Sequence, residues 1–252
     1  MNTAPRFISF QVSHYCEKVR WAMDRTGFAY REENHLPPLH RLKTMPLGGS
    51  TVPILVTKDA PLRDSTDILK YLDAAAPADR QLYPESPPLR LEVEQLEAEF
   101  SRKLGVAMRQ WAYFYVLPDR RLIQQLWSAG VPTWEKRLFS LTFPLTRRLV
   151  AQSYRVNRED SIAAYQRTQR IFQRVSDRLS DGRKYLVGDR LSAADITFAS
   201  LAAPGLRPAE YGGVAPMLEQ LPDAMVEQIQ ALRETIAGQY ALRLYREERH
   251  VR

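Results

Sequence analysis

The sequence predicts an α/β domain over residues 1–76 and an all-helical domain over residues 89–252. Short apolar runs that indicate strands alternate with helical periodicity only in the first domain, and helical periodicity dominates the second. Residues 77–88 are rich in proline and alanine, which is typical of a linker. The length of 252 residues also favours two domains, because single hydrophobic cores stop growing near ~250–300 residues.

The first domain is predicted to follow the order strand–helix–strand and then strand–strand–helix. A buried apolar run opens it, Gly27 ends the first helix, and Asp64 and Ser65 are favourable start residues for the last. The elements are expected at residues 7–10 (strand), 15–25 (helix), 28–33 (strand), 52–56 (strand), 61–63 (strand) and after 64 (helix), with an irregular or helical stretch at 37–45.

The second domain is predicted to contain helices only. They are expected at residues 89–115, 123–127, 134–154, 161–179, 192–201 and 222–245. Pro118 should end the first of them, and Pro144 should interrupt the third. The stretch 122–156 is the least regular part, and we interpret it as a lid or as an inserted partner-binding or membrane-facing element.

The charge of the chain is uneven. Lys and Arg number 36 against 29 Asp and Glu, and residues 101–160 alone hold 11 basic and 4 acidic residues. Such a surplus indicates either a solvated helical face or a surface that attracts acidic ligands, nucleic acid or an anionic membrane. No recognised nucleic-acid-binding motif is present, so we expect no nucleic-acid partner.

Cellular location and metal content are also constrained. No apolar run approaches the ~18–20 residues of a membrane span, and residues 1–10 do not resemble a signal peptide. The single cysteine, Cys16, excludes an internal disulfide and a multi-cysteine metal site. We therefore expect a cytoplasmic protein without a metal.

The junction between the first strand and the first helix carries the first candidate site. Ser13 and Cys16 have the spacing of a Cys-x-x-Cys motif whose first cysteine is replaced by serine. A helix N-terminus stabilises anions, and thiolates in particular. Ser13 could donate a hydrogen bond to the thiolate of a ligand, or it could only cap the helix. Cys16 could be an activated thiol, or it could be a small buried side chain.

Two further segments of the first domain could bind a ligand. Pro53 stands at a strand start, and a cis Val52–Pro53 bond would turn the backbone of Val52 outward, where an extended peptide could pair with it. Asp64 and Ser65 place a carboxylate and a hydroxyl at a helix N-terminus, a combination that can hold the amine and carboxylate of an amino-acid-like ligand. For Asp64 and Ser65, helix capping is the simpler alternative.

These motifs, together with Ser192-Ala193-Ala194-Asp195 in the second domain, resemble those of the cytosolic glutathione transferases. In the last motif Ser192 and Asp195 can form a capping box with Leu191 as its staple. The resemblance covers nearly the whole chain, and no subclass is assigned. It implies a thioredoxin-like first domain (βαβ-ββα), an all-helical second domain, glutathione as cosubstrate and a homodimer.

The resemblance also implies residue roles. Ser13 would stabilise the glutathione thiolate, and Val52, beside a cis Pro53, would pair with its cysteinyl part. Asp64 and Ser65 would hold the γ-glutamyl end, although Asp64 departs from the commoner Glu or Gln. His40 could reach the glycyl carboxylate, or it could be an ordinary surface histidine.

A dense aromatic and basic cluster in the first helix of the second domain could line the site of the second substrate. Met108, Trp111 and Tyr115 share one helical face, and Arg109 lies beside them. Such stripes more often form core than a binding site. The corresponding helix of the family lines the hydrophobic substrate site, so we expect these four residues there.

Three hypotheses about function follow. The first is a glutathione transferase of the detoxification type, which activates the glutathione thiolate for attack on an electrophilic, partly apolar small molecule. The second is a non-catalytic interaction protein of the same fold that uses the basic segment 101–160. The third is attachment of that segment to a membrane surface or to nucleic acid, and it has the least support.

Overall fold

A four-stranded sheet in the order β2–β1–β3–β4 supports the N-terminal domain of the computed structural model, which describes residues 4–250. β1 pairs with β2 in parallel and with β3 antiparallel, and β3 pairs with β4 antiparallel. The elements of this domain are β1 (Arg6–Ser9), α1 (His14–Thr26), β2 (Arg31–Asn34), α2 (Arg41–Thr44), β3 (Ile54–Val56), β4 (Pro61–Leu62) and α3 (Ser65–Ala75). The strand and helix order βαβ-ββα is therefore confirmed.

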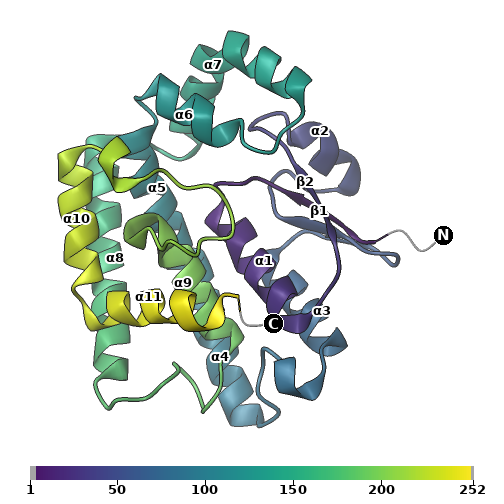
Figure 1. Cartoon of the computed structure of the whole chain (residues 1–252), viewed down its shortest axis with the longest axis vertical. Helices are drawn as coiled ribbons and strands as arrows, with labels where there is room; N and C mark the ends of the chain where they lie inside the picture. Colours follow the sequence, from purple (N-terminus) through teal and green to yellow (C-terminus); the bar gives the residue numbers. More distant parts are fainter. Residues whose placement is uncertain (1–3, 251–252) are drawn as a thin grey trace.

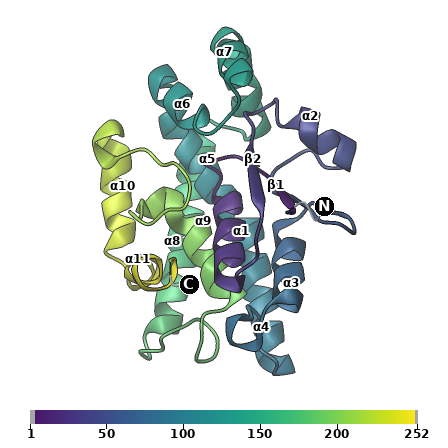
Figure 2. The ribbon, with the colours of Figure 1, turned by 45° about the vertical axis from the view of Figure 1, so that its right-hand side comes forward.

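Helix α1 lies between the sheet and the helical domain and packs against both α3 and α9 (Figures 1 and 2). Ser13 caps its N-terminus by accepting a hydrogen bond from the N–H of Cys16, and Gly27 ends it in the left-handed conformation that glycine tolerates. Its apolar face is buried, including Val19 and Met23. The local sequence therefore dictated both the ends and the buried face of this helix.

The helical domain begins at Pro87, two residues inside the expected linker. Its helices are α4 (Pro87–Glu99), α5 (Gly105–Val116), α6 (Arg120–Trp127), α7 (Thr133–Ser153), α8 (Arg158–Leu179), α9 (Ala193–Leu206), α10 (Asp223–Arg233) and α11 (Ile236–Glu248). α9 is buried nearly all round and lies among α1, α4, α5, α10 and α11. Figures 1 and 2 show α6 and α7 together at one end of the molecule.

A π-helical turn at Phe100–Leu104 joins α4 to α5. The side chains of α1 meet this turn: the hydroxyl of Tyr15 donates to the carbonyl oxygen of Ser101 (2.6 Å), and the imidazole of His14 contacts that of Gly105 (2.9 Å). A Cβ atom on Gly105 would lie 2.4 Å from the Tyr15 hydroxyl oxygen, so only glycine permits this approach. The turn thus fixes the N-terminus of α1 against α5.

The expected interruption at Pro144 is wrong, because α7 runs without a break from Thr133 to Ser153. A proline inside a helix leaves the carbonyl group four residues earlier without its usual donor. Here that carbonyl belongs to Ser140, and the guanidinium of Arg120 donates to it over 3.2 Å. A residue of the neighbouring helix α6 therefore satisfies the backbone group that the proline frees.

The Ser192–Asp195 motif forms the start of α9. The buried carboxylate of Asp195 accepts hydrogen bonds from the N–H (2.7 Å) and the hydroxyl (2.7 Å) of Ser192 and from the N–H of Leu186 (2.8 Å). The hydroxyl of Tyr240 donates to the same carboxylate. Asp195 thus connects α9, α11 and the loop before α9.

None of the helices between residues 4 and 250 is long and apolar enough to cross a bilayer.

Candidate functional site

A cavity of about 130 Å³ lies between the two domains. The N-terminal domain contributes the loop around Ser13 and the turn before β3, which contains Val52. The helical domain contributes one face of α5, part of α6 and the segment that follows α9. Ligand sites are commonly found where two domains meet, so this cavity is the candidate active site.

Ser13 lies at the wall of the cavity and at the N-terminus of α1. Its oxygen accepts only a long hydrogen bond, 3.3 Å from the backbone nitrogen of Cys16. Because an accepting hydroxyl oxygen still carries its own hydrogen, Ser13 can donate to an anion in the cavity. The free N–H groups of the first helical turn add positive potential at the same point.

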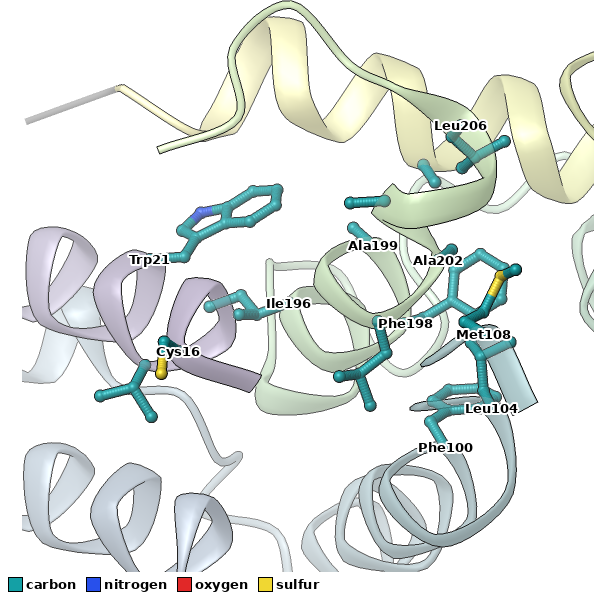
Figure 3. Close-up of a cluster of buried hydrophobic side chains, with 14 of the residues drawn as sticks. Cys16, Trp21, Phe100, Leu104, Met108, Ile196, Phe198, Ala199, Ala202 and Leu206 are labelled. Atoms are coloured by element: carbon teal, nitrogen blue, oxygen red, sulfur yellow. The ribbon is translucent and has the colours of Figure 1, made fainter. Parts of the chain in front are cut away.

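Cys16 does not line the cavity, and its side chain is fully buried. Figure 3 shows Cys16 within a cluster of buried hydrophobic side chains, on the same helix as Trp21. Burial raises the pKa of the Cys16 thiol, against smaller opposing effects of Arg20 and Ser13. The geometry therefore contradicts an activated thiol, because a thiolate would be desolvated there; Cys16 is a core residue.

Val52 and His40 lie at the cavity wall on the side of the sheet. The Val52–Pro53 peptide bond is cis, as the resemblance implied. The Nε2–H group of His40 donates to the carbonyl oxygen of Ser50 over 3.2 Å, and burial lowers the pKa of the imidazole, so His40 is neutral at neutral pH. Its Nδ1 atom has no hydrogen-bond partner among residues 4–250.

Asp64 and Ser65 stand at the start of α3 and are already engaged with the protein. Asp64 is the N-cap, and its Oδ1 atom accepts from the N–H of Thr66 over 2.7 Å. The hydroxyl oxygen of Ser65 accepts from the ammonium group of Lys18 over 3.2 Å. Ser65 is buried whereas Asp64 is exposed, and neither lies at the wall of the cavity.

Helix α5 presents a different face to the cavity from the one that we expected. Met108 and Trp111 are fully buried, and Figure 3 shows Met108 directed toward α9 beside Phe198. Tyr115 packs edge-on against Trp111. Among the four predicted substrate-binding residues, only Arg109 lines the cavity. The stripe at Met108, Trp111 and Tyr115 is core because α8 and α9 pack on that side.

Several residues of the cavity wall were not predicted from the sequence. Tyr113 follows Arg109 by four positions and stacks on Tyr154, with ring centroids 5.5 Å apart. Trp127 of α6 closes another side. A second helical stripe at residues 109, 112, 113 and 116 was the available signal for α5.

Two basic side chains of the helical domain reach the cavity. The guanidinium of Arg109 lies over the ring of Tyr154, 4.1 Å from its centroid. Arg207 follows the last turn of α9 in a left-handed backbone conformation (φ 49°). Burial lowers the pKa of Arg207 to about 10, so it remains charged at neutral pH.

The segment after α9 closes the cavity over the β1–α1 loop. The hydroxyl of Tyr211 donates to the carbonyl oxygen of Val12 (3.3 Å), and the N–H of Val214 donates to that of Gln11 (3.2 Å). A Cβ atom on Gly213 would lie 2.1 Å from the Gln11 oxygen, so this close contact requires glycine. Among residues 4–250, no group of three or more His, Cys, Asp or Glu side chains is placed to hold a metal ion.

Comparisons with known proteins agree with this architecture. The model of the glutathione S-transferase N-terminal domain matches residues 7–81, and that of the glutathione S-transferase C-terminal domain matches residues 143–239. The chain belongs to the glutathione S-transferase family. No curated protein is similar enough in sequence to count as a relative of this chain.

Solved structures share the fold over nearly the whole chain. A glutathione S-transferase from Sinorhizobium meliloti is 19% identical, with coverage of 96% of this chain and 93% of that chain and a TM-score of 0.59. One from Ceriporiopsis subvermispora, in complex with glutathione, is 16% identical, with 99% coverage of both chains and a TM-score of 0.62. Ure2p5 from Phanerochaete chrysosporium, cocrystallized with 1-(S-glutathionyl)-2,4-dinitrobenzene, is 19% identical, covers 98% and 96%, and has a TM-score of 0.57.

Proposed function

We propose that this protein is a glutathione transferase that binds glutathione and stabilises its thiolate for attack on an electrophile in the interdomain cavity. The S–C bond forms as the bond to the leaving group breaks, the leaving group departs with the electron pair, and the thiol proton goes to solvent. Solved relatives contain glutathione or its dinitrophenyl conjugate, which supports the choice of cosubstrate.

The position of Ser13 is the observation that carries this proposal. Its hydroxyl lies at the cavity wall, at the positive end of α1 and in a cavity that Val52 also lines, beside the cis Val52–Pro53 bond. A hydroxyl donor and a helix N-terminus both favour the charged form of a thiol placed there, which lowers its pKa.

The γ-glutamyl end of glutathione is proposed to lie at the start of α3. Asp64 is exposed there and uses only its Oδ1 atom as a cap, so its Oδ2 atom can accept from the ligand's ammonium group. Burial is the main cause that raises the pKa of Tyr15, a residue of the cavity wall, to about 12, and the charge of Asp64 adds a smaller effect in the same direction. Ser65 and His40 are proposed to contact the two carboxylates.

Titration of the ultraviolet thiolate absorbance of bound glutathione tests this proposal. We expect a thiol pKa about one to two units below that of free glutathione in the wild type, and a loss of most of this shift in Ser13→Ala. Ser180→Ala, an exposed serine far along the chain, is the matched control and should keep the wild-type shift. A thiol pKa that is unshifted in the wild type, or unchanged in Ser13→Ala, would contradict the proposal.

A non-catalytic interaction protein of the same fold is the second candidate. The observation that favours it is the exposed surface of α7, which belongs to the basic segment 101–160. This surface lies outside the cavity. If the protein fails to bind immobilised glutathione but captures a specific partner through residues 101–160, this alternative is favoured.

A further inference from the structure

Arg109 and Arg207 have no counter-charge in the protein. Within residues 4–250, neither guanidinium forms an ion pair with a carboxylate or donates a hydrogen bond to another residue. The guanidinium of Arg109 lies over the aromatic rings of Tyr154 and Tyr15, 4.1 and 6.0 Å from their centroids. The Nε atom of Arg207 is buried and has no partner.

The cavity that they share is free of acidic side chains. None of its described lining residues is Asp or Glu, and the two histidines, His14 and His40, are neutral at neutral pH because burial lowers both pKa values. The net charge of the lining is therefore positive. Both arginines are half-buried, and the buried Nε–H group of Arg207 lacks an acceptor, which a bound anion would supply.

The rest of the wall is aromatic and apolar. Tyr113, Tyr154 and Trp127 present ring surfaces, and α6 adds aliphatic side chains. Such a lining binds a flat apolar body, and a guanidinium binds a carboxylate through charge-assisted hydrogen bonds. Because the aromatic wall and the guanidinium groups line the same cavity, they favour a ligand that has both a flat apolar body and an anionic group.

We propose that the electrophile of this enzyme is an aromatic carboxylate whose anionic group is bound by Arg109 and Arg207. This inference rests on the proposed transferase function and names the substrate class of the same cavity. Arg207 lies outside the basic segment 101–160, so the anion site is made by two segments nearly a hundred residues apart in sequence.

A comparison of kcat/KM for a neutral and an anionic electrophile tests the inference. We would measure kcat/KM with glutathione for 1-chloro-2,4-dinitrobenzene and for 4-chloro-3,5-dinitrobenzoate, and follow the ratio of the two across variants. Because intrinsic reactivity cancels in that comparison, Arg109→Gln and Arg207→Gln should each lower the anionic-to-neutral ratio about tenfold. Arg102→Gln makes the same charge change at an exposed position outside the cavity and should keep the wild-type ratio.

A binding measurement without glutathione separates this inference from the transferase proposal. Calorimetry with 4-nitrobenzoate and with neutral nitrobenzene should show preference for the anion in the wild type and loss of that preference in both variants. If turnover is absent but this preference is present, the transferase proposal fails and the anion site stands. Equal affinity for both probes would overturn the proposed anion site. So would variants with an unchanged anionic-to-neutral ratio and a higher KM for glutathione, because the arginines would then bind glutathione and not the electrophile.

A second, independent observation concerns the outer face of α7. This helix buries Phe139, Phe143 and Val150 on one side, yet five large apolar side chains on another side face solvent. The exposed set, at helical spacing of four, three, four and four, is Trp134, Leu138, Leu141, Leu145 and Leu149, with Leu141 82% exposed. We call these five residues the α7 stripe; an exposed stripe of this kind marks an interaction surface.

The exposed charged residues of α7 are all basic. At 100° per residue, Arg137 and Arg148 border it directly, and neither forms an ion pair within residues 4–250. The only acidic residue of α7, Glu135, is buried against the sheet domain and does not face solvent with the stripe. Figures 1 and 2 show α7 at the end of the molecule, where a flat surface can approach it.

We infer that the α7 stripe docks on an anionic phospholipid bilayer surface. An amphipathic helix with Trp and Leu on one side and arginine beside them lies in the plane of such an interface, its apolar side chains among the acyl chains and its cations at the headgroups. Two copies of α7 would bring the same arginines together, so charge disfavours self-association through this face.

Sedimentation with vesicles tests this inference. The wild type should partition onto phosphatidylcholine vesicles that contain phosphatidylglycerol, less in high salt, and little onto pure phosphatidylcholine. Leu141→Gln with Leu145→Gln should lower the partition coefficient at least tenfold, and Arg137→Gln with Arg148→Gln should reduce its salt dependence. Ile162→Gln, at an exposed apolar residue of α8, is the control and should behave as wild type.

The replaced leucines are exposed, so circular dichroism should show an unchanged fold in the variants. Absence of wild-type partitioning, or equal partitioning of the leucine variant, would overturn the inference. A wild-type dimer in light scattering, together with a monomeric leucine variant, would also overturn the inference, because the α7 stripe would then bind a second copy of the chain.

Discussion

The imidazole of His14 donates from Nε2 to the carbonyl oxygen of Gly105, 2.9 Å away, across the boundary between the two domains. A carbonyl only accepts, so Nε2 carries the hydrogen and the ring can be neutral. Burial lowers the pKa of His14 to about 3, and the charge of Arg109 acts in the same direction. The first helical residue of α1 is thus held at the start of α5 by a group that is uncharged at neutral pH.

Stability should therefore depend on pH through His14. Between pH ~6.5 and ~3 the unfolded chain binds a proton at this residue and the folded chain does not, so stability falls as the pH falls, by up to about 1.4 kcal/mol per pH unit. His14→Gln removes this contribution and should flatten the dependence in urea unfolding measured across that range. His250→Gln, at an exposed histidine, should retain the wild-type slope; identical slopes for all three proteins would contradict the role of His14.

Cys16 should behave as a core thiol. Because burial raises its pKa, the thiolate fraction at neutral pH is low and access is blocked. A disulfide reagent should react with the native protein orders of magnitude more slowly than with the urea-unfolded protein. Cys16→Ala should cost about 1 kcal/mol of stability and leave the thiolate absorbance of bound glutathione unchanged. Rapid reaction of the native thiol would contradict this prediction.

Lys18 and Glu97 form a fully buried ion pair between α1 and α4, and Ser101 donates to Glu97 over 2.9 Å. Removing one partner leaves a buried charge unpaired, so Glu97→Ala should cost about 3–5 kcal/mol. Replacing both, as in Lys18→Met with Glu97→Leu, should cost less than Glu97→Ala alone. Denaturant unfolding measures both values, and a double variant that is less stable than the single one would refute this account.

Glu135 connects α7 to the sheet domain. Its carboxylate accepts from Nδ1 of His35 (2.5 Å) and from the N–H of Leu36 (2.9 Å), and all of these groups are buried. Glu135→Ala leaves both donors unsatisfied and should cost about 2–3 kcal/mol. The hydrogen-exchange rates of the backbone amides should rise in α7 and around residue 36. The neighbouring Lys136→Ala, at an exposed residue, should leave both measurements unchanged.

The features of the fold that depend on neighbouring residues were predictable from the sequence. Helix α1 begins after Ser13 and ends at Gly27. Its N-terminus needs a side-chain acceptor such as a hydroxyl, and its C-terminus needs a residue that tolerates the left-handed conformation; both requirements are local. The same holds for the succession of strands and helices along the chain, since apolar runs and turn residues are visible in single segments. At Pro144 this local reasoning failed, because Arg120 of another helix supplies the missing donor.

The cavity depended on relationships that no local pattern contains. Helical periodicity gives α5 two apolar faces, and only the placement of α8 and α9 decides that Trp111 is core and Tyr113 is cavity wall. Arg207 has no motif, and it becomes a cavity residue because α9 ends beside the loop that contains Ser13. The order of the elements and the family could be predicted from the sequence, because both depend on motifs of a few neighbouring residues. Which charges lack a partner could be learned only from the folded chain, because the groups that could pair with Arg109 or Arg207 are brought near them, or kept away, by the packing of distant segments.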